Sequence, residues 1–148
     1  VDYINKILFI VLMYRNYKKL RIWYLSRELI VDLYKLTSKL PESESNNLRS
    51  QIQRASVSCC VNIAEASSRR TKKSYLQFLN YSFGSAKELE CLIIICFDLK
   101  YISDQDYVYY GDRVDKFLRS LFKYVQCVDT NKFFDYGNSK QKPKLFDS

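Results

Sequence analysis

The fold of this chain is decided by residues 48–93, which read LRSQIQRASVSCCVNIAEASSRRTKKSYLQFLNYSFGSAKELECLI. The first half repeats apolar or small side chains at helical spacing, at Leu48, Ile52, Ala55, Cys59, Ile63 and Ala66. The second series is Tyr75, Phe78, Leu79, Ser82, Ala86, Leu89, Ile93 and Cys96. Both have the 3.6-residue period of a helix with one buried face. The sequence therefore predicts two helices, with Ser43 and Thr71 as their N-caps.

Two more periodic segments flank this pair. One runs from about Tyr14 to Lys39. It is expected to end at Leu40, because a residue that precedes proline is disfavoured in the α region. The other begins after Ser103, a predicted N-cap, and its pattern stops after about Asp129.

Turn residues are scarce, with three glycines and two prolines in 148 residues. Gly84 falls inside a predicted helix, where we expect it to permit close contact with a neighbouring helix. The four segments predict an all-α protein, specifically an antiparallel up-down-up-down four-helix bundle. The bundle is expected over residues 13–128, followed by a flexible tail over 129–148. Residues 1–12 are expected to be an N-terminal extension or upstream reading frame. Their apolar run is too short to span a membrane.

Basic residues outnumber acidic residues by 24 to 16, which gives a net charge of +8. A positive domain favours contact with polyanions such as RNA, DNA or an acidic protein. A basic, solvated surface is an equally ordinary explanation. The excess is concentrated in residues 14–24 and 45–75, and the second stretch has six cations against one acid. The candidate nucleic-acid-binding residues are Arg15, Lys18, Lys19, Arg21, Arg49, Arg69, Arg70, Lys72 and Lys73.

Each basic cluster has a second feature that suits nucleic acid. The cations of residues 69–73 lie beside a predicted helix N-terminus, whose N–H groups attract phosphate. The earlier cations alternate with Tyr14, Tyr17, Trp23 and Tyr24, and such a mixture suits stacking contacts with single-stranded RNA. The same aromatic residues are equally compatible with a place in the core or in an interface.

The helix predicted over 43–68 also carries a polar stripe, made of Gln51, Arg54, Ser58, Asn62, Glu65 and Arg69. The next helix offers a matching set, Gln77, Tyr81, Ser85 and Glu88. Three interpretations remain open: a solvated face, a polar network that fixes helix register or subunit pairing, and a ligand or catalytic site. In the network, Arg54 would pair with Glu65 or Glu88. Arg54, Asn62, Glu65, Ser85 and Glu88 would then hold the bundle or its subunit seams.

The chain lacks the catalytic residues that most enzyme classes require. The chain has no histidine, so a di-iron bundle built from Glu-x-x-His motifs is excluded, and so is a Cys–His nucleophile pair. No glycine-rich phosphate-binding loop occurs. The five cysteines match no zinc or CxxC spacing and are expected to be reduced, small, buried side chains of a cytosolic protein. We therefore expect no enzyme activity, metal, cofactor or small-molecule substrate; Glu65 and Glu88 alone are a weak catalytic signal.

The stretch around residues 48–93 resembles the core signature of the bacterial 23S rRNA intervening-sequence protein family. The matching residues are Gln51, Arg54-Ala55, Asn62-Ile63-Ala64-Glu65, Arg70, Phe78-Leu79, Gly84-Ser85 and Glu88-Leu89, with Trp23, Tyr34 and Pro41 upstream. The resemblance covers roughly Met13 to Val125. It departs at Ala66, where the family usually has glycine, and we expect the helix to continue more regularly there.

The resemblance implies an antiparallel four-helix bundle and, as in relatives, a ring-like homopentamer. It also implies a gene inside a 23S rRNA gene or beside a retroelement reverse transcriptase, whose basic accessory proteins bind nucleic acid. We expect a non-enzymatic, cytoplasmic protein that binds RNA or other nucleic acid as a homo-oligomer, without membrane contact. The alternative is a structural or protein-binding adaptor, for example of a reverse transcriptase, without direct nucleic-acid contact.

Overall fold

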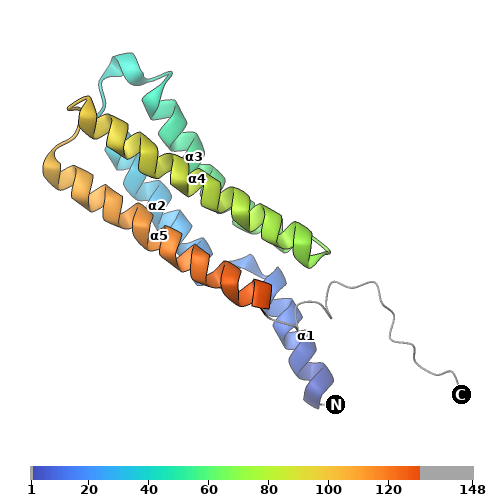
Figure 1. The fold of residues 1–148 in the computed structure, drawn as a ribbon. Helices are drawn as coiled ribbons and strands as arrows, with labels where there is room; N and C mark the ends of the chain where they lie inside the picture. Colours follow the sequence, from blue (N-terminus) through green and yellow to red (C-terminus); the bar gives the residue numbers. More distant parts are fainter. Residues whose placement is uncertain (1, 131–148) are drawn as a thin grey trace, which may run out of the picture.

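The computed structural model describes residues 2–130, which are helical almost throughout (Figure 1). The α-helices are α1 (Asp2–Arg15), α2 (Arg21–Thr37), α3 (Leu48–Ser67), α4 (Lys72–Asp98) and α5 (Asp104–Thr130). Two short 3-10 helices, η1 (Tyr17–Lys19) and η2 (Glu42–Glu44), precede α2 and α3. No strand occurs in this described part of the chain, and the prediction of an all-α protein is confirmed.

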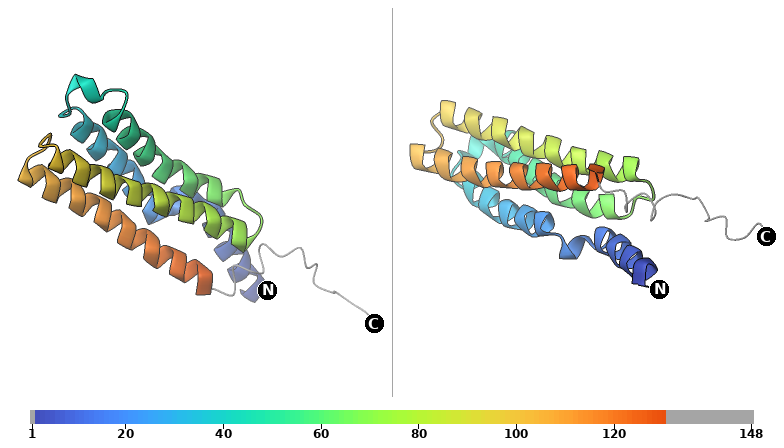
Figure 2. Two further views of the ribbon diagram at one scale, coloured as in Figure 1. Left: turned by 45° about the horizontal axis from the view of Figure 1, so that its top comes forward. Right: turned by 60° about the horizontal axis from the view of Figure 1, so that its bottom comes forward.

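The four helices α2 to α5 lie side by side, and α1 projects from one end (Figures 1 and 2). α3 contacts α2 and α4, and α5 contacts α4 and α2. Polar contacts join the ends: Lys39 Nζ lies 2.7 Å from Asp106 Oδ1, and Lys72 Nζ donates to the Asp129 carbonyl at 2.6 Å. This packing is consistent with the up-down-up-down bundle that the sequence predicts.

The core consists of the predicted apolar stripes. Leu33, Ile52, Leu79 and Leu121 each come from a different helix and are fully buried. Every residue of the stripe that runs from Leu48 to Ala66 is buried, and the stripe from Tyr75 to Cys96 is buried apart from the half-buried Phe78. Removal of these side chains from water is the main stabilising contribution to such a fold.

The first predicted helix, from Tyr14 to Lys39, is wrong as one segment. The α-helix begins only at Arg21, because Leu20 has extended backbone (φ −82°, ψ 129°) and donates its N–H to the Tyr17 carbonyl. The Leu20 side chain is 9% exposed and belongs to the core, so the chain bends where this residue is anchored. Residues 2–15 form a separate helix that contacts η1.

The predicted helix ends are right at two places and wrong at others. Thr71 caps α4 by accepting a hydrogen bond from Ser74 N at 3.1 Å, and the Ser103 hydroxyl accepts one from Asp106 N at 3.1 Å. Ser43 is not an N-cap, because it lies in η2; the carboxylate of Glu44 instead accepts from Leu48 N at 3.4 Å. α5 includes residues 129 and 130, and the remainder of the predicted tail lies outside the described residues.

Gly84 does not permit a close helix contact, contrary to our expectation. α4 continues through this position, and a Cβ atom placed there would meet nothing within 4 Å. Ala66, in contrast, is fully buried within α3, which continues to Ser67 as the sequence predicts.

We predict that Gly84→Ala raises the free energy of unfolding by about 0.5–1 kcal/mol, because alanine loses less backbone entropy in a helix and has room for its methyl group. Chemical denaturation followed by circular dichroism measures this change. Gly111→Ala is the matched control on α5, where a Cβ atom also has open space. A lower free energy of unfolding for Gly84→Ala, without a similar loss for Gly111→Ala, would show that residue 84 has no room for a methyl group.

Candidate nucleic-acid interface

The first basic cluster lies where α1, η1 and α2 meet. Because Leu20 is anchored in the core, the residues on either side of it turn outward, and Arg15, Lys18, Lys19 and Arg21 are all exposed. The tight turn is held by backbone hydrogen bonds, from Lys19 N to the Asn16 carbonyl at 3.0 Å and from Leu20 N to the Tyr17 carbonyl at 3.0 Å. Four cations therefore project from one short segment.

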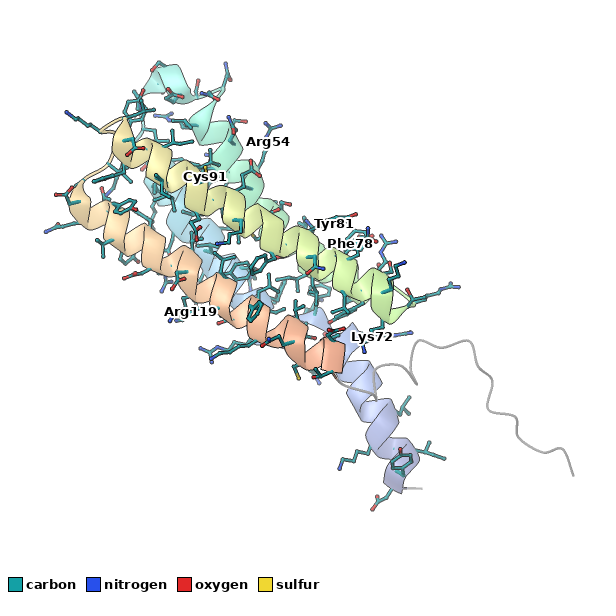
Figure 3. All side chains as sticks on the ribbon, in the orientation of Figure 1. Arg54, Lys72, Phe78, Tyr81, Cys91 and Arg119 are labelled. Atoms are coloured by element: carbon teal, nitrogen blue, oxygen red, sulfur yellow. The ribbon has the colours of Figure 1, made fainter. Side chains whose placement is uncertain are left out.

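The second basic cluster lies in the turn between α3 and α4, but its four cations differ in their surroundings. Arg69 pairs with Glu65 and covers the Phe78 ring, with its guanidinium carbon 4.1 Å from the ring centroid. Lys72 donates to the Asp129 carbonyl at the end of α5 (Figure 3). Arg70 and Lys73 are exposed and have no ion-pair partner among the described residues. Arg70 and Lys73 are therefore the cations of this turn that remain available to a ligand.

The two clusters, although separated by some fifty residues in the chain, lie at the same end of the bundle (Figures 1 and 2). The start of α2 and the turn between α3 and α4 are both at the end from which α1 projects, and η1 contacts α3. Acidic residues occupy the opposite end, at Glu42 and Glu44 in η2 and Asp104 and Asp106 in the first turn of α5. The bundle thus has one basic end and an opposite end, here called the acidic end, where Lys39 pairs with Asp106 and Arg49 with Glu42.

Arg49 is not brought together with the other predicted cations. It lies at the start of α3, at the acidic end, where its guanidinium donates to the Leu40 carbonyl and lies 3.1 Å from Glu42 Oε2. Its partners belong to the connection between α2 and α3, so its role here is to hold that connection. The basic end consists of the other eight predicted residues.

Part of the predicted polar network forms between α3 and α4. The hydroxyls of Ser58 and Ser85 are 2.8 Å apart, and Asn62 Nδ2 donates to Ser58 Oγ at 2.9 Å. Ser85 also donates to the Tyr81 carbonyl at 3.0 Å. These groups are partly buried, and each makes at least one hydrogen bond, as partly dehydrated polar groups require.

The charged members of that network do not join it. Arg54, Glu65 and Glu88 are all exposed, and the expected pair of Arg54 with either glutamate is not formed. Glu65 pairs instead with Arg69, one helical turn further along α3. Arg54 has no ion-pair partner among residues 2–130 and faces solvent beside Val57 and Ser58.

One charged group in the core was missed by sequence reasoning. Asp32 is 7% exposed, and its carboxylate accepts a hydrogen bond from Arg113 Nε of α5 at 2.7 Å, a contact that raises the pKa of Arg113. The available signal was an aspartate within the apolar run Ile30–Leu33. This ion pair joins α2 to α5, the two helices that are most distant along the chain in the bundle.

The cysteines are free, as predicted, but only some are buried. Cys59 and Cys96 are fully buried, whereas Cys91 and Cys127 are exposed and Cys60 is intermediate. Desolvation raises the pKa of the Cys59 thiol to about 12 and that of Cys96 to about 11. The expectation of five buried cysteines is therefore wrong for Cys91 and Cys127.

Two further properties concern the kind of site present. Within residues 2–130, no three histidine, cysteine, aspartate or glutamate side chains gather as ligands for a metal ion would. None of the helices described there combines the length and apolar character needed to cross a bilayer. The features that stand out are the basic end and the polar surface between α3 and α4.

The fold and this charge distribution define a small helical protein whose four packed helices carry one strongly basic end. Residues 18–123 match the family model described as 23S rRNA-intervening sequence protein. The chain therefore belongs to the 23S rRNA-intervening sequence protein family, as the resemblance of residues 48–93 indicated.

A solved structure from Bacteroides thetaiotaomicron VPI-5482 has a similar fold. It is described as a protein with unknown function from the S23 ribosomal protein family. The superposition gives a TM-score of 0.66 at 21% sequence identity and covers 71% of this chain and 95% of that chain. A comparison with curated proteins finds no match.

We predict that Ellman's reagent at pH 8 modifies Cys91 and Cys127 rapidly in the folded protein and leaves Cys59 and Cys96 unmodified. Thiolates are the reactive species, and burial with a raised pKa keeps both Cys59 and Cys96 as inert thiols. Mass spectrometry of the modified peptides identifies the sites. In denaturant all five cysteines should react; rapid modification of Cys59 before unfolding would contradict the described packing of α3 against α4.

Proposed function

We propose that this protein is a non-enzymatic nucleic-acid-binding protein whose basic end contacts the phosphates of its ligand. The observation that carries this proposal is the convergence of two basic clusters, at residues 15–21 and 69–73, on one end of the bundle. A polyanion is the partner that such a concentration of charge favours, through release of its counterions. Family membership supports a role connected with 23S rRNA.

The basic end has the elements that phosphate binding requires. Arg15, Lys18, Lys19 and Arg21 are exposed where α1, η1 and α2 meet, and Arg70 and Lys73 are exposed at the start of α4. The N-terminus of α4 adds the positive end of a helix dipole to the second group. The far end has no comparable excess of cations, because Lys39 and Arg49 pair there with Asp106 and Glu42, so a polyanion is attracted to the basic end.

We predict that the double variant Arg70→Ala/Lys73→Ala binds a short RNA more weakly and with a smaller dependence on salt. Removal of two phosphate contacts should reduce the slope of log K against log salt concentration by about 2. Fluorescence anisotropy of a labelled RNA at several salt concentrations measures both quantities.

The matched control for this experiment is Lys35→Ala/Lys116→Ala, which removes the same charge from exposed positions away from the basic end. It should change the slope much less. Equal effects of the two double variants would mean that only net charge matters, and an RNA affinity that does not respond to salt would contradict the proposal altogether.

The proposal also includes two structural features. Each chain folds as an antiparallel four-helix bundle, and several copies assemble, as the homopentamer that the resemblance implies. A partly apolar surface formed by α2 and α3 supports the assembly of several copies. Val57 and Val61 are 36% and 52% exposed, and they border a hollow of about 350 Å³ together with Tyr34, Arg54 and Ser58. Apolar groups surrounded by polar ones are characteristic of protein–protein interfaces, and a second copy of this chain is the occupant we propose.

We predict that light scattering gives a mass several times that of the 17.6 kDa chain, and that Val61→Glu lowers it. A charged side chain in the centre of an interface is costly to desolvate, whereas it is tolerated on an exposed helix face. Val108→Glu on α5 is the control, since Val108 is 59% exposed. A wild-type mass equal to that of one chain would contradict the proposed oligomer. A monomer that also fails to bind RNA would favour the adaptor role.

A further inference from the structure

An aromatic and cationic group lies at the start of α2, within the first basic cluster. The Trp23 ring lies 5.2 Å from the Tyr17 ring and 5.3 Å from the Tyr24 ring, both in edge-to-face geometry. The Arg27 guanidinium lies over Trp23, 4.9 Å from the ring centroid. Tyr17 and Trp23 are half-buried against the core, so they form the base of this group.

Two planar groups of this set face solvent. Tyr24 is 51% exposed, and Arg27 is exposed and has no ion-pair partner among the described residues. Residues 14–27 contain five cations and no acid, so this segment carries a concentration of positive charge that attracts phosphate. Sequence reasoning named the aromatic residues here but missed Arg27, which belongs to the same face one turn further along.

We propose that Tyr24 and Arg27 form a stacking site for the bases of a single-stranded nucleic acid whose phosphates lie along Arg15 to Arg21. This inference rests on the proposed function and specifies its ligand class. Tyrosine rings and guanidinium planes are the surfaces on which unstacked bases are held. In a duplex the bases already stack on one another, and their faces are closed to such a site.

The other aromatic groups of the described chain are less suited to this role. Phe97 and Tyr107 stack at 4.4 Å, but both pack against the core at the acidic end. Tyr81 is exposed beside Phe78, but the nearby Arg69 is already paired with Glu65. Within residues 2–130, the group at Tyr24 combines an exposed ring with the exposed guanidinium of Arg27, which has no ion-pair partner there.

Trp23 supplies a direct reporter, because it is the only tryptophan of the chain. A titration of the full-length protein with a single-stranded RNA of about ten nucleotides, a length within the range that one small domain binds, should quench its fluorescence. The same sequence as a duplex should bind more weakly and quench less. The same titration with single-stranded DNA of that sequence shows whether RNA or DNA is preferred. Quenching by either single-stranded nucleic acid supports the stacking site.

The decisive variants are Tyr24→Leu and Tyr24→Phe. Loss of one base–aromatic contact should weaken binding of the single strand by about fivefold to a hundredfold in Tyr24→Leu, whereas Tyr24→Phe keeps the ring and should bind like the wild type. Tyr109→Leu is the matched control, because Tyr109 is 52% exposed and also lies edge-to-face with a neighbouring ring. Circular dichroism confirms that each variant is folded.

The outcomes separate this inference from the proposed function. If single strand and duplex bind equally and Tyr24→Leu binds like the wild type, while salt and Arg70→Ala/Lys73→Ala still weaken binding, the stacking site is wrong and the phosphate interface stands. If neither RNA binds, the proposed function itself fails. A quenching titration with the single strand that shifts to about fivefold to a hundredfold higher RNA concentration in Tyr24→Leu, and is unchanged in Tyr24→Phe, establishes the site.

Discussion

The close contact between α3 and α4 is the constraint on which the rest of the structure depends. Ala55, Cys59, Ser82 and Ala86 are small and at most 4% exposed, so the two helices approach each other closely. The Ser82 hydroxyl donates to the Cys59 carbonyl at 2.7 Å, which satisfies a polar group inside this contact. Because the turn that joins the two helices is short, their packing also fixes where the cations of that turn project.

Much of the fold was readable from the sequence, because helical periodicity directly reflects burial. The stripes of α3 and α4 and the caps at Thr71 and Ser103 depend on neighbours within a few residues. The failures have non-local causes. The break before Arg21 follows from the anchoring of Leu20 in the core, with no proline or glycine to mark it, and the burial of Asp32 depends on an arginine 81 residues away.

The candidate interface was predictable as a set of residues but not as a surface. Each basic cluster is visible as a local excess of charge, whereas their shared position at one end depends on the order in which the helices pack. The sequence also could not show which cations the fold itself uses. Arg49 and Lys72 hold connections within the bundle and Arg69 has a carboxylate partner, so equal charge in the sequence corresponds to unequal availability on the surface.

The number of helices in the bundle determines where the bundle begins and ends. With four packed helices the chain enters at Arg21 and leaves at Thr130 from the same end, and Lys72 fastens the last turn of α5 there. A label attached at Arg21 or at Thr130 therefore lies beside the basic clusters, whereas the connection at residues 99–103 offers an attachment point a full helix length away.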